Sequence, residues 1–208
     1  MSEGFRVPAG PGESELTEKR SRFLGHLIPV ESEEEAKDFI ARVKRQFHDA
    51  RHNCWCYRIR GGAVRYSDDA EPQGTAGLPM LEILQREGIE NAVCVVTRYF
   101  GGVLLGTGGL LRAYQKAAKG AVEDAGISVV RAWTKMSIVC DYSDYEKIRS
   151  ELEQQNAVIS DTEYGEKVTL TVLVSQGQGT LVTEKLQDRT AGKCICTEEG
   201  IVNQAVPT

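Results

Sequence analysis

Apolar residues recur along this chain with two periods, which predict an alternation of strands and helices. Alternating or near-continuous apolar runs, typical of strands, lie at 21–30, 53–59, 63–67 and 92–98. Helical spacing of apolar residues follows at 36–47, 78–85 and 110–125. Ser32 precedes the first of these helices and Glu35 follows three residues later, which is the pattern of a capping box. The first part of the chain is therefore predicted to combine strands and helices in one domain.

A second series of elements begins near Trp133. Runs typical of strands lie at 135–140, 157–162, 167–174 and 195–202, and helical patterns lie at 145–152 and 181–187. Ser143 and Glu146 form another candidate capping box. The order β-α-β-β-α-β is that of a ferredoxin-like domain. The sequence thus predicts an α+β protein of two domains, 1–133 and 134–208, without a Pro- or Ser-rich linker between them.

A glycine-rich segment between Arg98 and Tyr114, R-Y-F-G-G-V-L-L-G-T-G-G-L-L-R-A-Y, joins a predicted strand to a predicted helix. Glycine is favoured where the backbone takes a positive φ or where another group approaches closely. A glycine-rich turn into a helix also presents free backbone N–H groups to an anion. The segment lacks the lysine–serine end of a P-loop, and Leu111 replaces the third glycine of a dinucleotide fingerprint. What remains is a general anion site.

Arginines supply bidentate contacts to phosphate, and the neighbouring aromatic residues can stack on a base. The residues expected to form this site are Arg51, His52, Arg98, Tyr99, Phe100, Gly101, Gly102, Gly106, Thr107, Gly108, Gly109 and Arg112. The alternative is that the glycines only let the strand and the helix pack closely, with both aromatic residues in the core.

Charge is distributed unevenly along the chain. Its net charge is −5, and all of it falls on residues 134–208, because residues 1–133 are neutral overall. Residues 91–122 contain Arg98, Arg112, Lys116 and Lys119 and no acid. A local basic patch can attract phosphate even on an acidic protein. We therefore expect RNA or the ribosome as the partner of the glycine-rich segment, and a protein partner for the acidic C-terminal domain.

The polar segment 68–77, D-D-A-E-P-Q-G-T-A-G, is expected to be an irregular loop because it contains a proline and two glycines. The residues of this loop expected to face the cleft that contains the glycine-rich anion site are Asp68, Asp69, Glu71, Gly74, Thr75 and Gly77. Three carboxylates in four residues could hold Mg²⁺ or Ca²⁺, but the spacing is not that of an EF-hand. We favour acids that cap the following helix or pair with Arg51 or Arg98.

His52 is the histidine that lies inside a motif, and with Asp68 or Asp69 it could act as a general base. The chain would then be an enzyme acting on a phosphorylated small molecule or nucleotide with a divalent metal. No neighbouring serine or cysteine has the features of a nucleophile. We therefore favour a non-enzymatic protein that needs no metal and no cofactor.

Six cysteines lie in hydrophobic runs, which is typical of a reducing compartment. The C-x-C pairs at 54–56 and 194–196 should each place two sulfurs on one face of a strand. That spacing is narrower than in most structural zinc sites. No apolar run approaches the ~18 residues of a membrane span, and the first twelve residues lack the apolar core of a signal peptide. We expect a cytoplasmic protein without membrane contact.

Three runs resemble the IMPACT family, and in particular its bacterial YigZ type. They are A-R-H-N-C at 50–54, S-D-D-A-E-P-Q-G-T-A-G-L-P-M-L at 67–81, and V-V-T-R-Y-F-G-G-V-L-L-G-T-G-G-L-L-R-A-Y at 95–114. The resemblance covers essentially the whole chain; Ala70 stands where the family usually has glycine.

This resemblance implies an N-terminal domain with the fold of a small-subunit ribosomal protein and of domain IV of elongation factor G. It implies a C-terminal domain similar to the C-terminal domain of the same factor. Eukaryotic members of the family regulate translation through a kinase pathway, so the resemblance also implies a regulatory, translation-associated role.

Overall fold

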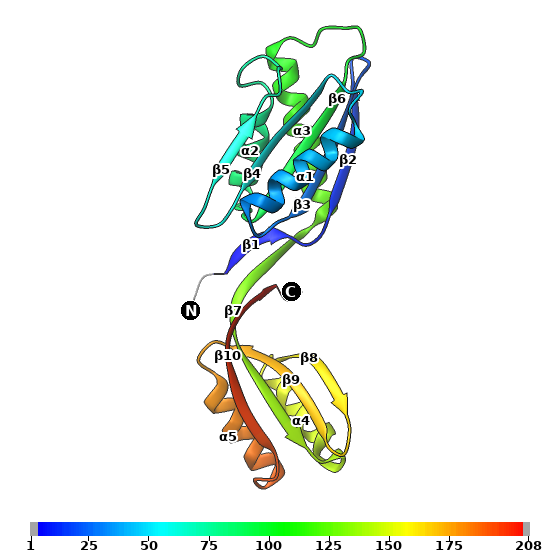
Figure 1. Cartoon of the computed structure of the whole chain (residues 1–208). Helices are drawn as coiled ribbons and strands as arrows, with labels where there is room; N and C mark the ends of the chain where they lie inside the picture. Colours follow the sequence, from blue (N-terminus) through cyan, green and yellow to red (C-terminus); the bar gives the residue numbers. More distant parts are fainter. Residues whose placement is uncertain (1–3, 206–208) are drawn as a thin grey trace. The chain divides into compact units, whose positions relative to one another are not determined.

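The computed structural model describes residues 4–205, and its chain forms two compact units (Figure 1). One unit runs from residue 5 to residue 129 and the other begins at residue 130. Each unit combines a β-sheet with helices. The α+β class predicted from the sequence is confirmed. Among the described residues, no helix has both the length and the apolar character needed to cross a membrane.

The N-terminal unit is built on one antiparallel sheet of five strands, in the order β2-β3-β6-β4-β5. These strands are β2 (Gly12–Glu18), β3 (Ser21–Pro29), β4 (His52–Arg58), β5 (Val64–Ser67) and β6 (Ala92–Tyr99), and a short strand β1 (Phe5–Pro8) precedes them. The central strand β6 is buried from its first residue to Arg98. It has helices on both faces, which accounts for its near-continuous apolar sequence.

Helices cover both faces of this sheet (Figure 1). Helix α1 (Glu33–Gln46) lies on one face, and α2 (Gly77–Arg86) and α3 (Thr107–Ala125) lie on the other. The predicted N-cap of α1 is confirmed, because Ser32 Oγ accepts the Glu35 N–H at 3.2 Å. The Glu35 carboxylate accepts the N–H of Glu31 at 2.9 Å, one residue earlier than in a standard capping box.

Helix α3 touches the backbone of the sheet directly, through small residues. Gly12 lies against the backbone of Ala121, and a Cβ added at Gly25 would lie 2.8 Å from the carbonyl oxygen of Ala117. Ser14 Oγ donates to that same carbonyl at 2.7 Å. Both strand glycines are required here, because any side chain would push the helix away from the sheet.

The C-terminal unit has strands β7 (Ile127–Cys140), β8 (Val158–Tyr164), β9 (Val168–Ser175) and β10 (Ile195–Ala205), and helices α4 (Tyr142–Gln154) and α5 (Gly179–Thr190). Four strands are paired antiparallel in the order β10-β7-β9-β8. One apolar cluster joins the sheet to both helices, so α4 and α5 cover the same face. The predicted element order, β-α-β-β-α-β, is the order observed.

One local expectation is wrong, and strand β2 was missed. Helix α4 begins at Tyr142 with Asp141 as N-cap, in the extended conformation that an N-cap adopts, so Ser143 lies inside the helix and does not cap it. Strand β2 was not expected, because its sequence G-E-S-E-L-T-E is mostly polar. It is an edge strand with many exposed side chains, which leaves almost no apolar alternation to detect.

Candidate functional site

Three motifs of the sequence meet at one end of the N-terminal sheet. Strand β6 ends at Tyr99, opposite Arg22 near the start of β3, and Arg98 lies opposite His52 at the start of β4. The chain then continues through residues 100–106, here called the glycine loop, into α3. Antiparallel pairing therefore brings the turn before β3, the start of β4 and the glycine loop to the same end of the sheet.

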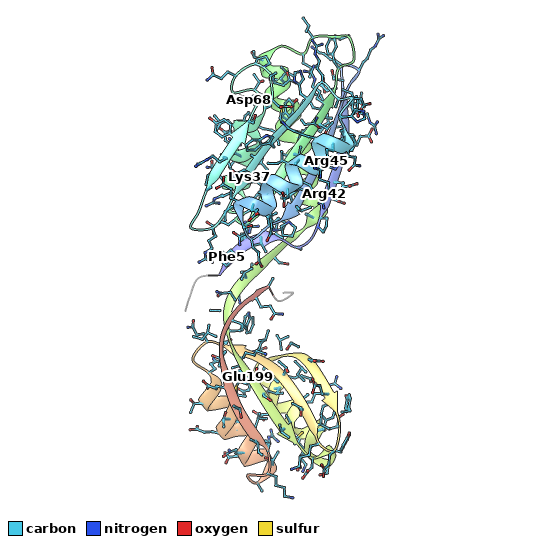
Figure 2. All side chains as sticks on the ribbon, viewed as in Figure 1. Phe5, Lys37, Arg42, Arg45, Asp68 and Glu199 are labelled. Atoms are coloured by element: carbon cyan, nitrogen blue, oxygen red, sulfur yellow. The ribbon has the colours of Figure 1, made fainter. Side chains whose placement is uncertain are left out.

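Asp68 organises the segment that leads into α2. Its carboxylate accepts the backbone N–H groups of Gly74 at 2.8 Å, Ala76 at 3.0 Å and Gly77 at 2.8 Å. Figure 2 labels this residue beside the loops at that end of the unit. The first N–H groups of a helix lack partners within the helix and favour negative charge. The expectation that an acid of this segment caps the following helix is confirmed.

Asp69 is also held by groups of the protein. Its carboxylate lies 2.7 Å from Lys44 Nζ and accepts the N–H of Asn53 at 2.7 Å. Its backbone carbonyl oxygen lies 2.8 Å from His52 Nδ1. A carbonyl only accepts, so His52 donates from Nδ1 and contacts Asp69 through the backbone, not through the carboxylate. Asp69 and Ala70 have φ of +43° and +67°, which explains why a glycine would suit position 70.

Glu71 and Arg98 form an ion pair in the interior. Arg98 Nη1 lies 2.7 Å from Glu71 Oε1, and the hydroxyl of Tyr114 donates to the same oxygen at 2.8 Å. Arg98 is 5% exposed and Glu71 8% exposed. Burial raises the pKa of the Tyr114 hydroxyl and of the Cys54 thiol beside it, so both stay protonated. The pairing of the acidic segment with Arg98, left open by the sequence, is present.

This pairing corrects the role expected for Arg98. Its guanidinium was expected to hold a phosphate, but it is turned inward, where it neutralises the carboxylate of Glu71 and donates to Ser21 Oγ at 3.3 Å. Its Nε is buried without a hydrogen-bond partner among the described residues. A buried carboxylate without a counter-charge would cost several kcal/mol. Arg98 therefore supports the site from behind and does not line its surface.

The glycine loop is anchored at its start and open beyond it. Ser21 Oγ accepts the N–H of Gly101 at 3.2 Å, and Gly101 lies so close to the backbone of Arg20 that a Cβ would overlap it. Gly102 and Gly106 have φ of +82° and +72°. Gly101 thus allows a close approach, and Gly102 and Gly106 allow a positive φ. The approach at Gly101 is to the turn before β3 and not to the helix, and Phe100 is 40% exposed, so the close-packing alternative with both aromatic residues in the core is wrong. Leu104, at the exposed part of the loop, is 82% accessible to solvent.

The end of the loop leads into an open first turn of α3. Gly106 is the N-cap and offers no side-chain cap, and Thr107 and Gly108 are exposed. Arg112 is exposed, and its Nη1 lies 3.5 Å from the position of a Cβ at Gly108. The remaining expected contacts differ in accessibility. Tyr99 donates its hydroxyl to Asp49 at 2.9 Å, whereas Thr75 is buried and donates to the Pro72 carbonyl at 2.6 Å.

Exposed basic side chains surround the glycine loop. Lys19 and Arg20 come from the turn between β2 and β3, which packs on Gly101. Arg51 lies beside Phe100, with its guanidinium carbon 5.8 Å from the ring centroid. We call Lys19, Arg20, Arg51 and Arg112 the basic rim. Sequence reasoning missed the first two, because they belong to no motif and only the strand register brings them here.

Five of the six cysteines lie on strands as expected, and Cys194 directly precedes β10. Cys54 and Cys56 belong to the same apolar cluster of the N-terminal unit, together with Cys94. In the C-terminal unit, Cys194 Sγ lies 3.9 Å from Cys196 Sγ, so each C-x-C pair shares one face. Between residues 4 and 205, no three His, Cys, Asp or Glu side chains are grouped so as to hold a metal ion.

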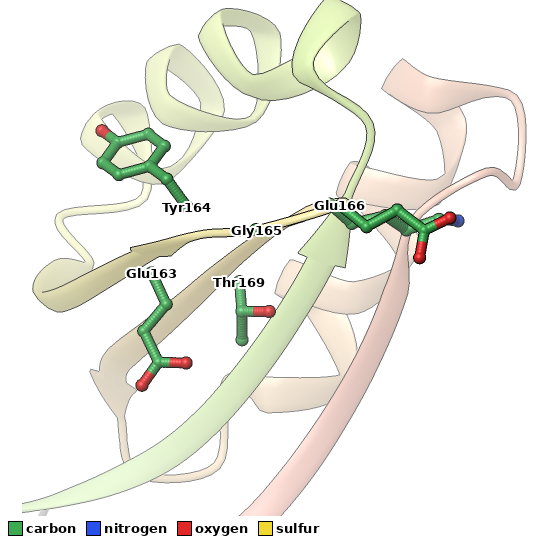
Figure 3. A pocket seen from close by; sticks show the side chains of 6 residues that line it. Glu163, Tyr164, Gly165, Glu166 and Thr169 are labelled. Carbon is green, nitrogen blue, oxygen red and sulfur yellow. The ribbon is translucent and has the colours of Figure 1, made fainter.

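A separate hollow lies at the turn between β8 and β9 of the C-terminal unit. It is lined by Glu163, Tyr164, Gly165, Glu166, Lys167 and Thr169. In Figure 3, Glu163 and Thr169 point to one side of the sheet and Tyr164 points to the other, toward a helix. The hollow carries two carboxylates and one lysine, in line with the acidic character of this unit. A protein partner for this unit remains a prediction.

Comparison with domain families divides the chain in two. Residues 19–122 match the Impact N-terminal domain, and residues 138–193 match a domain of unknown function, DUF1949. The first match contains all the residues of the site described above.

Full-length relatives come from several bacteria. The chain is 37% identical to the IMPACT family member YvyE of Bacillus subtilis, over 88% of this chain and 85% of the relative. It is 33% identical to the IMPACT family member YigZ of Escherichia coli, over 91% and 95%. A crystal structure of a hypothetical protein is similar with a TM-score of 0.62 and 32% identity, over 94% of this chain and 97% of the other.

Proposed function

This chain belongs to the IMPACT family, and we propose that it is a regulatory, translation-associated protein that binds RNA, free or in the ribosome, through the glycine loop and the basic rim. The observation that carries this proposal is the separation of charge at this end of the N-terminal unit. The carboxylates of segment 68–71 bind other groups of the protein, whereas the side chains of the basic rim face solvent.

The consequence of that separation is that the carboxylates of segment 68–71 repel phosphate only weakly at the basic rim. Asp68 is satisfied by backbone N–H groups, Asp69 by Lys44, and Glu71 by Arg98. Within the part of the chain that the structure describes, no ion pair uses the side chains of the basic rim. The rim is therefore free to attract a polyanion, and the open first turn of α3 adds backbone N–H groups.

We also propose the finer fold assignments and a cytoplasmic location. The C-terminal unit is ferredoxin-like, which is supported by its element order and by its sheet order β10-β7-β9-β8. The N-terminal unit shares the fold of the small-subunit ribosomal protein and of domain IV of elongation factor G, as family resemblance suggests. Six free cysteines favour a reducing compartment.

Co-sedimentation with ribosomes and binding to a labelled RNA over a series of salt concentrations test the proposal. The variant Arg20→Ala/Arg51→Ala/Arg112→Ala should bind more weakly. Each lost phosphate contact should lower the slope of log K against log salt by ~0.7. The matched control is Lys37→Ala/Arg42→Ala/Arg45→Ala, which removes the same charge from α1 (Figure 2). Equal binding by the rim variant and the wild type, or an equal loss in the control, would refute the proposal.

The enzyme alternative receives less support from the geometry. It required Asp68 and Asp69 as metal or proton-transfer groups, but their carboxylates are engaged by backbone N–H groups and by Lys44. His52 uses Nδ1 on a carbonyl. A clear rise in melting temperature with a nucleotide and Mg²⁺ would restore this alternative, because a ligand at ~100 times its Kd stabilises the folded state by ~2.7 kcal/mol.

A further inference from the structure

Phe100 is an aromatic side chain held at the surface of the proposed site. It follows directly after the last residue of β6 and is 40% exposed. Its ring centroid lies 5.5 Å from the guanidinium carbon of Arg98 and 5.8 Å from that of Arg51. Arg98 is buried and Arg51 is exposed, so the ring contacts one internal and one surface guanidinium.

The internal contact is rigid. Arg98 is fixed by Glu71 at 2.7 Å and by Ser21 at 3.3 Å, and it also lies over Phe23, with its guanidinium carbon 5.5 Å from that ring centroid. The same Ser21 oxygen accepts the N–H of Gly101, the residue after Phe100. Phe100 is thus positioned both through its ring and through its neighbouring backbone, which lowers the ordering cost of binding a ligand on it.

The surface contact can be exchanged. Arg51 is exposed and has no ion-pair partner among the described residues, so its guanidinium can leave the ring for a phosphate while a base takes its place. Leu104, 82% exposed, and Val103 add apolar surface beside it on the same loop. An exposed ring, apolar neighbours and a basic rim are the elements of a site for single-stranded nucleic acid, where bases stack on aromatic groups and the phosphates follow basic groups.

We propose that this site selects unpaired bases, with Phe100 as the residue on which a base stacks and Arg98 as the residue that positions it. The inference rests on the proposed function, because the basic rim must supply the phosphate contacts. In a duplex the bases are already stacked on one another and their faces are not accessible, so a duplex can use the rim but not Phe100. Single-stranded RNA, or an unpaired loop of a larger RNA, is therefore the preferred ligand.

The test compares three probes of equal length: a uridine 12-mer, the same backbone without bases, and a 12-base-pair RNA duplex. Phe100→Leu keeps an apolar side chain but cannot stack in this way, and should weaken binding of the uridine 12-mer by about 5- to 50-fold. It should leave binding of the abasic strand and the duplex unchanged. Phe100→Trp should retain binding, and its added fluorescence should be quenched by the uridine 12-mer and not by the abasic strand.

Arg98→Lys keeps the positive charge beside Glu71 but loses the planar guanidinium beneath the ring. It should lower the ratio of uridine 12-mer affinity to abasic-strand affinity, whereas a general loss of folded protein would lower both affinities together. Circular dichroism of each variant monitors the fold. Phe100→Leu and the rim triple variant then separate the two proposals.

Each outcome supports or refutes the stacking inference, the proposed function, or both. If Phe100→Leu binds all three probes like the wild type while the rim variant loses binding, the stacking inference is wrong and the proposed function stands. If the rim variant also binds normally, both are wrong. If the wild type binds none of the probes, the stacking inference is wrong, and the proposed function is wrong as well if the wild type also fails to co-sediment with ribosomes. Binding to anionic lipid vesicles in place of oligonucleotides would likewise overturn both, since the exposed apolar loop and the rim would then serve a membrane surface.

Discussion

The buried pair of Glu71 and Arg98 should be worth far more to stability than a surface ion pair. Arg98→Met removes the cation and leaves the Glu71 carboxylate in the interior, with the Tyr114 hydroxyl as its remaining hydrogen bond. Loss of one partner of a buried pair typically costs about 3–5 kcal/mol, because an uncompensated charge stays buried. Glu71→Gln keeps the shape and an acceptor for Tyr114 but leaves the guanidinium unpaired, so we expect a loss of similar size.

The double variant distinguishes pairing from general disruption. Glu71→Gln/Arg98→Met removes both charges, so no buried charge is left without a partner. Its loss of stability should be smaller than the sum of the two single losses by about 2 kcal/mol. Additive losses would show that the two side chains act independently and would refute the idea that Arg98 is held inside by Glu71.

Urea unfolding measures these differences, provided that the two units are observed separately. The chain has two tryptophans, Trp55 in β4 and Trp133 in β7, so a Trp133→Phe background leaves one fluorescent reporter in the N-terminal unit. With a slope of about 2 kcal/mol per molar urea, a loss of ~4 kcal/mol lowers the unfolding midpoint by ~2 M. An unchanged midpoint for Arg98→Met would contradict the structure directly.

Two further predictions concern the glycines and pH. Gly101→Ala places a Cβ against the backbone of Arg20 and should destabilise the fold by about 1–3 kcal/mol. Gly108→Ala lies in an exposed helical turn and should stabilise the fold by about 0.5–1 kcal/mol. The two variants should shift the melting temperature in opposite directions, and equal shifts would contradict the loop geometry. Burial lowers the pKa of His26 in the folded state, although Glu13 at 3.7 Å acts in the opposite direction. As the pH falls below ~6.5, His26 therefore takes up a proton in the unfolded chain before it does so in the folded protein. The free energy of unfolding declines from that pH down to the pKa of His26 in the folded state. His26→Leu should flatten this decline between pH 7 and pH 5, and an unaltered slope in urea unfolding would exclude His26 as its source.

The elements with a strong apolar period were predicted well. The helix expected at 36–47 is observed at Glu33–Gln46, and the strand expected at 92–98 is observed at Ala92–Tyr99. Their burial on one face or on both is a local property of the sequence, so periodicity suffices. Strand β2 escaped detection because its stability comes from pairing with β3 and from contact with α3, neither of which leaves an apolar pattern in its own residues.

The sequence singled out motifs that come together in the fold, but it did not indicate the direction of their side chains. The motifs around His52, Asp68 and Arg98 do meet at one end of the sheet. An arginine in a motif does not reveal whether its counter-charge will be a ligand or a carboxylate 27 positions away, because tertiary packing decides that. For the same reason Lys19 and Arg20 could not be assigned, since only the packing of the Arg20 backbone on Gly101 brings this turn to the candidate site.

The direct contact of α3 with the sheet has a consequence for divergence within the family. Where Gly25 meets Ala117, main chain rests on main chain, and no rotamer can move aside to accommodate a bulkier neighbour. The spacing of the two backbones at such a contact does not change when the surrounding core residues are substituted over evolutionary time. The distance between the end of β6 and the first turn of α3 should therefore stay nearly constant in relatives whose other core residues differ. The outline of this end of the unit should then persist where most of the sequence that encodes it has changed.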